Sequence, residues 1–150
     1  GVRTFEAAAY LRRLGADTVE VKKRFANSME AYQLKTRIVS SAKVYRGCAI
    51  AASEDTSDDM RIAAPQAADE LLSINGVNAS FVLYQTQDNI TISARSMGSI
   101  NVQVVMERMG GGGHLTMAGT YIEGETLGSV VEQLMKNIDV YHEQASAQQA

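Results

Sequence analysis

Apolar and polar positions along the first 42 residues recur with the spacing that is typical of helices. Residues 5–14 predict a helix that has Thr4 as its N-cap and ends at Gly15. Asp17 and Glu20 lie three residues apart, a capping-box spacing that predicts the start of a second helix. The chain is therefore expected to begin with consecutive helices.

A third helix is predicted to run to about Ala42. Asn27 and Glu30 repeat the capping-box spacing in front of it. One face of this helix carries the apolar residues, which are Ala31, Leu34 and Ile38. We expect a domain boundary near residue 42, because the pattern there changes from helical to β-type.

From residue 44 onward the pattern begins with strands. Residues 44–53 form a β-rich run, and the acidic stretch 53–59 is typical of a loop. Pro65 is suited to the first turn of a helix, because its missing N–H is not needed there. We expect that helix to end at Asn75-Gly76, which is a common turn sequence.

Residues 79–86 and 89–96 predict a β-hairpin with a short Gln87-Asp88 link. The first of these strands is apolar almost throughout, which predicts a central place in the sheet. The second alternates between apolar and polar residues, so one of its sides is expected to face the core.

The last third of the chain predicts two helices around one strand. Residues 101–109 have apolar positions at helical spacing, residues 117–124 read as a strand, and residues 126–144 carry a long apolar stripe. The final residues, 146–150, are expected to fray.

The predicted order is three helices followed by β-α-β-β-α-β-α. This order predicts an α/β (α+β) fold with a mixed β-sheet of about four to five strands flanked by helices and preceded by an N-terminal helical segment. Residues 1–41 and 42–150 are the two expected parts.

Composition excludes several classes of protein. The formal net charge of the 150 residues is −3, which argues against broad binding of nucleic acid but leaves room for a small anion site. Cys48 is the only cysteine, so neither an intrachain disulfide nor a zinc site built from cysteines can form. No stretch reaches the ~20 apolar residues that a membrane span needs.

The run Gly110-Gly111-Gly112-Gly113-His114 is the most unusual feature of the chain. Consecutive glycines lose much backbone entropy on ordering, so such a run indicates a backbone that a ligand approaches closely. Their N–H groups can form a concave anion site, and the His114 imidazole can donate to a phosphate or ribose oxygen. A flexible linker or a helix C-cap is the alternative, although one glycine suffices for a cap.

Three polar residues at the end of the second hairpin strand are further candidates. Ser93 and Arg95 share a side of the strand, and Ser96 follows. An arginine at this place can bind a phosphate with two N–H groups, although a surface ion pair is the more common role of an isolated arginine. Asn101 is a candidate of a weaker kind, because it can cap the next helix.

Two segments, ISARS at 92–96 and RMGGGGHLTMAGTYI at 108–122, resemble the signature of the DHH-associated domain. This domain is the C-terminal half of the DHH phosphoesterase superfamily. Residues 1–17 resemble the end of the catalytic DHH domain in the GdpP-type cyclic-di-AMP phosphodiesterases. Residues 32–51 and 65–85 are similar to the linker and first strands of that subfamily.

The resemblance implies a substrate-binding role for this chain. It implies that Gly110 to Gly113, His114, Arg95, Ser93, Ser96 and, more weakly, Asn101 contact a nucleotide. The two divalent metal ions of the family, usually manganese, belong to the DHH domain, whose Asp-His-His motif is absent here. We therefore expect that this chain binds no metal and has no turnover alone.

The same resemblance implies how the chain relates to a parent protein. Residues 1–41 are expected to be a helical remnant of the DHH domain and its linker in a truncated piece, and they are expected either to pack on a second copy or to rearrange. The missing DHH domain and a cyclic dinucleotide are the other expected partners. The parent is expected to be bacterial, with this domain in the cytoplasm and a membrane anchor elsewhere.

Three other functions remain open on the sequence alone. One is an oligoribonuclease or exonuclease of the same superfamily. Another is a non-catalytic RNA-binding module, similar to the domain appended to alanyl-tRNA synthetases, which the acidic balance makes less favourable. The last is a structural or dimerisation domain in which the glycines only form a turn.

Overall fold

The computed structural model of the chain describes residues 1–13 and 28–149. The first helix, α1 (Val2–Arg13), begins two residues before Thr4, so Thr4 lies inside the helix and the prediction that it is the N-cap is wrong. The predicted second helix and the stop at Gly15 fall outside the described residues. Helix α3 (Met29–Ser41) is capped by Ser28, whose hydroxyl accepts a hydrogen bond from the Ala31 N–H at 3.1 Å.

Within the described residues, six strands form one mixed sheet, as the fold class predicted. The order is β1-β2-β3-β4-β6-β5, and only the pairing of β2 with β3 is parallel. The strands are β1 (Lys43–Tyr45), β2 (Cys48–Ser53), β3 (Ala79–Thr86), β4 (Asn89–Ser96), β5 (Gly112–Gly113) and β6 (Met117–Glu123). The predicted hairpin, its boundaries and the central place of its first strand are confirmed as β3 and β4.

The strand count is higher than expected for two local reasons. The predicted run 44–53 is split into β1 and β2 by a tight turn at Arg46 and Gly47, whose φ angles are 51° and 78°. Two residues of the glycine run, Gly112 and Gly113, form the additional edge strand β5.

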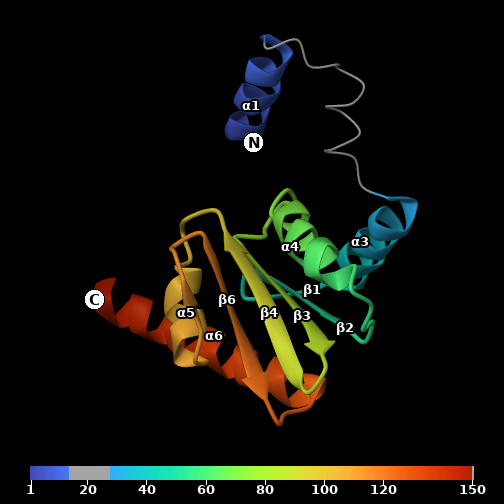
Figure 1. The fold of residues 1–150 in the computed structure, drawn as a ribbon. Coiled ribbons are helices and arrows are strands. Elements are labelled where there is room, and N and C mark those ends of the chain that lie inside the picture. Colours follow the sequence, from blue (N-terminus) through green and yellow to red (C-terminus); the bar gives the residue numbers. More distant parts are fainter. Residues whose placement is uncertain (14–27, 150) are drawn as a thin grey trace.

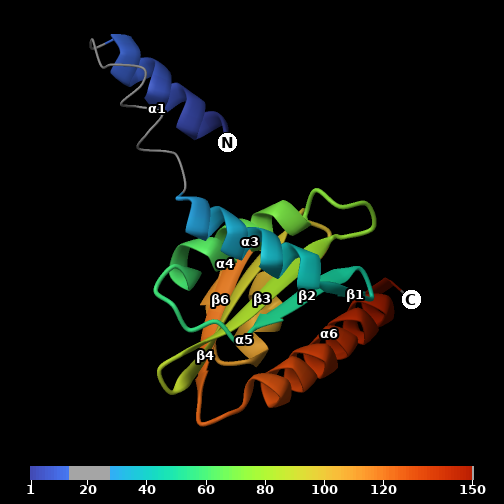
Figure 2. The same ribbon diagram turned by 90° about the vertical axis from the view of Figure 1, so that its right-hand side faces the viewer.

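Helices cover both faces of the sheet (Figures 1 and 2). Helices α3 and α4 (Met60–Leu71) lie on one face, whereas α5 (Val102–Arg108) and α6 (Leu127–Gln149) lie on the other. Helix α4 begins at Met60, so the prediction that Pro65 lies in a first turn is wrong and the proline is in the helix interior. Helix α6 continues to Gln149, which also contradicts the expected fraying of residues 146–149.

Two cores follow from this layering. The core beneath α5 and α6 contains the inward side of β4 (Ile90, Ile92 and Ala94) together with Phe81, Leu134 and Ile138. The core beneath α3 and α4 contains Val82 and Tyr84 of β3 together with Leu34, Ile38, Met60 and Leu71. Leu34 and Ile38 are almost fully buried, so α3 packs on the sheet even though the predicted boundary near residue 42 assigned it to the N-terminal part. The division into 1–41 and 42–150 stays a prediction.

Candidate functional site

One part of the sheet presents polar side chains and glycines away from the α5/α6 core. Arg95, Ser93 and Thr91 of β4 lie opposite Met117, Gly119 and Tyr121 of β6, and Gly112 of β5 lies opposite Gly119. Residues that face one another in an antiparallel ladder point to the same side. We call these seven residues the open face. Tyr121 and Met117 are 71% and 53% exposed there.

The first two glycines of the run end helix α5. Gly110 has a φ of +84°, and its N–H donates to the carbonyl of Glu107 at 3.1 Å. The Gly111 N–H donates to the carbonyl of Met106 at 2.8 Å. With Met109 as the C-cap, these two bonds form a Schellman motif, which satisfies carbonyls that the helix leaves open.

Close packing against β6 explains why other positions of the run lack a side chain. A Cβ atom added to Gly111 would lie 2.2 Å from the carbonyl oxygen of Gly119, and one added to Gly113 would lie 2.4 Å from the Cα of Ala118. A Cβ atom on Gly112, by contrast, meets nothing within 4 Å. The glycine at position 112 therefore leaves open space above the sheet.

These contacts correct the expected mechanism of the loop. An anion nest built from four successive amides is wrong for Gly110 and Gly111, because both N–H groups already donate to carbonyls of α5. The His114 N–H donates to the Met117 carbonyl at 2.7 Å and extends the ladder of β5 and β6. Since hydrogen-bonded and non-bonded pairs alternate in such a ladder, the Gly113 N–H points away from β6.

The side chain of His114 remains available to a ligand. His114 is exposed, and the register of β5 and β6 places it opposite Met117, which itself lies opposite Arg95. His114 and Arg95 therefore lie on the same side of the sheet and two strands apart, about 10 Å between backbones.

Arg95 is held at the edge of helix α4. Its Nε atom lies 3.1 Å from Oδ1 of Asp69, and its Nη1 atom donates to the Ala94 carbonyl at 2.9 Å. The arginine side chain is 13% exposed and the aspartate side chain 62%. Within the described part of the chain Nε finds no aligned hydrogen-bond acceptor, so Asp69 neutralises the charge without holding the guanidinium by a hydrogen bond.

Two of the candidates serve the fold. Ser96 faces the α5/α6 side of β4 and is 6% exposed, and its hydroxyl donates to the Ile100 carbonyl and accepts from the Gly98 N–H. Because this side chain is buried, a ligand on the open face cannot reach it, and the predicted contact is not available in this arrangement. Asn101 is the N-cap of α5 and accepts from the N–H groups of Gln103 and Val104, so the capping role is confirmed. Ser93 is half-buried on the open face.

Two hollows lie beside each other on the open face. The first, of about 430 Å³, has Gly110, Gly111, Gly112 and Gly119 in its lining, and we call it the glycine hollow. The second, of about 480 Å³, is lined by the polar or aromatic residues Thr56, Asp58, Arg61, Tyr84, Thr86, Gln87, Asn89, Thr91 and Tyr121, and we call it the polar hollow. Thr91 and Tyr121 line both. Burial raises the pKa of Tyr84, so this phenol stays neutral at physiological pH.

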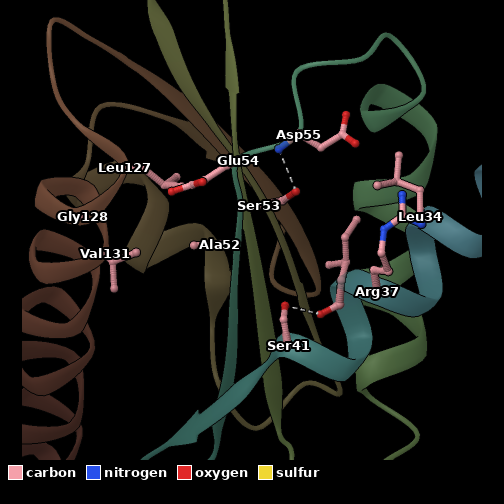
Figure 3. Close-up of a pocket in the computed structure, with 11 residues that line it drawn as sticks. Leu34, Arg37, Ser41, Ala52, Ser53, Glu54, Asp55, Leu127, Gly128 and Val131 are labelled. Atoms are coloured by element: carbon pink, nitrogen blue, oxygen red, sulfur yellow. Dashed lines mark hydrogen bonds between the residues drawn. The ribbon is translucent and has the colours of Figure 1, made fainter.

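A separate groove of about 590 Å³ lies elsewhere, between α3 and the start of α6 (Figure 3). Arg37, Glu54 and Asp55 are the charged residues of its lining. The candidate residues of the glycine run and of β4 are not in its lining, so it is distinct from the open face.

Comparison with family models decides the family. The model of the DHHA1 domain matches residues 48–143. The chain belongs to the DHHA1 domain family. The match includes every strand from β2 onward and most of α6, so the open face and both hollows lie within the DHHA1 domain.

Curated relatives of this DHHA1 domain include proteins that are named cyclic-di-AMP phosphodiesterases. The protein PdeA of Listeria monocytogenes is 46% identical over 143 residues, which are 94% of this chain and 22% of the relative. The GdpP protein of Bacillus subtilis is 40% identical over 147 residues, or 95% of this chain and 22% of the relative. The chain thus spans about a fifth of the length of these relatives.

Solved structures share the fold of the DHHA1 domain. An exopolyphosphatase-related protein of Bacteroides fragilis has a TM-score of 0.67 and 22% identity, covering 91% of this chain and 43% of that chain. The pGpG-specific phosphodiesterase PggH of Vibrio cholerae has a TM-score of 0.51 and 20% identity, covering 80% and 42%. At these identities the likeness shows the fold alone.

The two metal ions that the resemblance implies for a DHH domain would need a cluster of metal-ligating side chains. Among residues 1–13 and 28–149, no group of three or more His, Cys, Asp or Glu side chains is placed to hold a metal ion. No step of a metal-dependent reaction is therefore assigned to these residues. The described helices also include none that is long and apolar enough to cross a membrane.

Sequence reasoning missed Tyr121, Thr91 and the polar hollow. The available signal was the alternation within residues 117–124, where Ala118 and Thr120 turn inward and Tyr121 turns outward. The contribution of Arg61 could not be found in this way, because it depends on how the start of α4 packs beside the β3–β4 hairpin.

Proposed function

We propose that this DHHA1 domain binds the substrate of a metal-dependent phosphodiesterase that hydrolyses cyclic-di-AMP to the linear dinucleotide. The observation that carries the proposal is that Arg95, Ser93 and His114 share the side of the sheet on which Gly112 and Gly119 leave the backbone without side chains. The names and the identity of the curated relatives support the choice of substrate.

The chemistry of the open face suits a phosphodiester. Arg95 supplies a positive charge that Asp69 neutralises from an exposed position, and a guanidinium can bind two phosphate oxygens at once. The hydroxyl of Ser93 and the imidazole of His114 supply further hydrogen-bond donors. Because Gly112 and Gly119 have no side chains, a sugar or phosphate can approach the backbone closely.

The chemical step belongs to another part of the parent protein in this proposal. Two divalent metals in a DHH domain would activate the attacking water and stabilise the charge on the phosphate. This domain then contributes binding and orientation of the substrate, which lower the barrier by fixing the reacting atoms. We expect no turnover by the 150-residue chain alone.

Further parts of the proposal concern the parent and its assembly. We place the domain in the cytoplasm of a bacterial, membrane-anchored parent, and one relative of 37% identity is named a membrane protein fused to ribosomal protein bL9, from Onion yellows phytoplasma. A contact between two copies through residues 1–41 is supported by Val2 and Phe5 of α1, which are 72% and 78% exposed.

The test is a titration of the isotope-labelled 150-residue chain followed by NMR amide shifts. Cyclic-di-AMP is expected to shift Ser93, Arg95, Gly112 and His114, and Arg95→Gln is expected to weaken binding. Lys35→Gln on α3 is the control, because that lysine pairs with Glu70 on the α3/α4 surface. Shifts confined to other surfaces, or none at millimolar ligand, would overturn the proposal.

Competing ligands separate the proposal from its rivals. Tighter binding of linear oligonucleotides than of cyclic-di-AMP would favour an oligoribonuclease. Binding of structured RNA with a steep dependence on salt would favour an RNA-binding module. Either result would contradict the proposed substrate.

A further inference from the structure

Tyr121 occupies an unusual place on the open face. It lies in β6 opposite Thr91, its side chain is on the same side of the sheet as Arg95, and it is 71% exposed. The β6 backbone beneath it is paired with β4 and, nearer its start, with β5. The ring therefore projects from a strand whose position is fixed by the sheet.

The ring stands between the two hollows. The glycine hollow lies on its side toward Gly119, one pleat or about 7 Å along β6. The polar hollow is shared by Tyr121 and Thr91 with Arg61, Tyr84 and Asn89. A flat ligand group lying on the Tyr121 ring would thus have the hollow lined by glycines on one side and hydrogen-bonding groups on the other.

We propose that Tyr121 is the stacking platform for one nucleobase of the dinucleotide, with the edge of that base in the polar hollow. The inference rests on the proposed function and deepens it by assigning a base subsite. An aromatic ring on an open sheet stabilises a stacked base by about 1–3 kcal/mol and accepts any base.

The polar hollow offers partners for the base edge. The side-chain amides of Asn89 and Gln87 each carry an acceptor and donors side by side, which match the adjacent groups on a purine edge. The hydroxyls of Thr86 and Thr91 lie 3.0 Å apart and share one hydrogen bond. They form a polar wall of the hollow, which leaves the two amides to contact the base.

The electrostatics of the hollow favour a neutral group over a second phosphate. Asp58 and Arg61 both line it, so their opposite charges offset one another, and Arg95 lies at the other end of the open face. A base in the polar hollow and a phosphate near Arg95 therefore match the distribution of charge. The nucleotide would lie along β4 and β6, with its sugar above the glycines.

The absence of tryptophan from the chain makes the test sharp. In Tyr121→Trp, the single indole lies on the proposed platform, and its fluorescence is excited at a wavelength where bases absorb little. Cyclic-di-AMP is expected to quench this emission, because a stacked base deactivates an indole. Tyr32→Trp is the matched control, since Tyr32 is 54% exposed on helix α3 and lies outside both hollows.

Affinities of three further variants complete the test. Tyr121→Ala is expected to weaken cyclic-di-AMP binding about 5- to 100-fold, whereas Tyr121→Phe keeps the ring and the affinity. Binding of inorganic pyrophosphate, which has no base, is expected to be unchanged in Tyr121→Ala and reduced in Arg95→Gln. Amide spectra of each variant establish that it is folded.

The outcomes separate this inference from the proposed function. The base subsite alone would be overturned by three results together. Arg95→Gln would weaken the binding of cyclic-di-AMP, Tyr121→Ala would leave it unchanged, and the fluorescence of Tyr121→Trp would not be quenched. Failure of the wild-type chain to bind either cyclic-di-AMP or pyrophosphate would overturn both. Quenching by an unrelated protein but not by a nucleotide would assign Tyr121 to a protein interface and reject the subsite.

Discussion

The Nε atom of Arg95 lies 3.1 Å from Oδ1 of Asp69, which joins strand β4 to the last turns of helix α4. The exposed carboxylate of Asp69 therefore competes with any incoming anion for the guanidinium of Arg95. Asp69→Asn is expected to raise the affinity for cyclic-di-AMP about two- to fivefold, which corresponds to the loss of one surface ion pair. Calorimetric titration measures this change.

The neighbouring carboxylate provides the control for that experiment. Glu70 pairs with Lys35 at 3.3 Å, so Glu70→Gln removes one negative charge from the same helix without freeing Arg95. Equal effects of the two substitutions would show that net charge, and not the Arg95–Asp69 contact, sets the affinity.

Neighbouring glycines are expected to respond in opposite ways to alanine. Gly111→Ala places a Cβ atom 2.2 Å from the Gly119 carbonyl oxygen and is expected to lower the free energy of unfolding by about 1–3 kcal/mol. Gly112→Ala meets no atom within 4 Å, so stability is expected to stay within about 0.5 kcal/mol while the glycine hollow narrows and nucleotide affinity falls. Urea unfolding and calorimetry measure the two effects. Unchanged affinity in Gly112→Ala would argue against a ligand above this glycine.

Asn101 is expected to matter for stability and not for binding. Its side-chain oxygen accepts from the N–H groups of Gln103 and Val104, so Asn101→Ala is expected to lower the free energy of unfolding by about 1 kcal/mol. Asn101→Asp keeps the acceptor and serves as the control. If the alanine variant is stably folded but binds the nucleotide more weakly, Asn101 contributes to binding and this prediction is wrong.

The carboxylate of Asp139 is expected to make the free energy of unfolding depend on pH in the acid range. It accepts from the Tyr45 hydroxyl at 2.6 Å and from Arg46 Nη1 at 2.9 Å, and these hydrogen bonds hold the pKa of Asp139 below its ordinary value of 3.8. A carboxyl whose pKa is lowered on folding stabilises the fold above its unfolded pKa and loses this contribution as the pH falls toward its folded pKa. Unfolding in urea at pH 7, 5, 4 and 3 is expected to show this loss.

Substitution of Asp139 isolates its share of the acid sensitivity. Asp139→Asn is expected to lower stability at pH 7 and to flatten the profile between pH 5 and 3. Glu132→Gln, at an exposed position of the same helix, controls for the loss of one charge. Parallel profiles for wild type and Asp139→Asn would contradict the assignment.

The thiol of Cys48 is expected to be unreactive toward alkylating reagents in the folded protein. The thiol is fully buried in the α5/α6 core, and burial raises its pKa to about 11. Because the thiolate is the reactive species, alkylation by iodoacetamide at pH 8 should proceed only through unfolding. Mass spectrometry of the labelled chain at increasing urea measures this, and rapid labelling without urea would contradict the burial.

The elements that sequence reasoning located well are those whose pattern is local. The boundaries of β3 and β4 coincide with the predicted 79–86 and 89–96, because apolar alternation and a two-residue link determine a hairpin together. Helix α4 was predicted, but its start at Met60 was missed because Pro65 was assigned to a first turn. The apolar residues Met60, Ala63, Ala64 and Ala67 have helical spacing, and their burial outweighs one interior proline.

The sequence indicated which residues belong to the candidate site better than it indicated how they could contact a ligand. The glycine run indicated an unusual backbone, but the direction of each N–H depends on the cap of α5 and on pairing with β6, which is a tertiary contact. Ser96 and Ser93 differ by an odd number of positions, and the register of β4 places only Ser93 on the open face. Tyr121 is exposed because, among the described helices, α3 and α4 do not extend over β6 on this side of the sheet (Figure 1).

The Schellman cap of α5 and the pairing of β5 with β6 also affect what ligand capture requires. Glycine is the most mobile residue type in an unfolded chain, and a loop of glycines that became ordered only around a ligand would weaken binding by the entropy it loses. Here that entropy is lost when the chain folds, since Gly110, Gly111 and His114 are already tied to Glu107, Met106 and Met117. The surface that we propose for a nucleotide is thus already ordered in the folded chain, and selectivity would come from fit instead of induced closure.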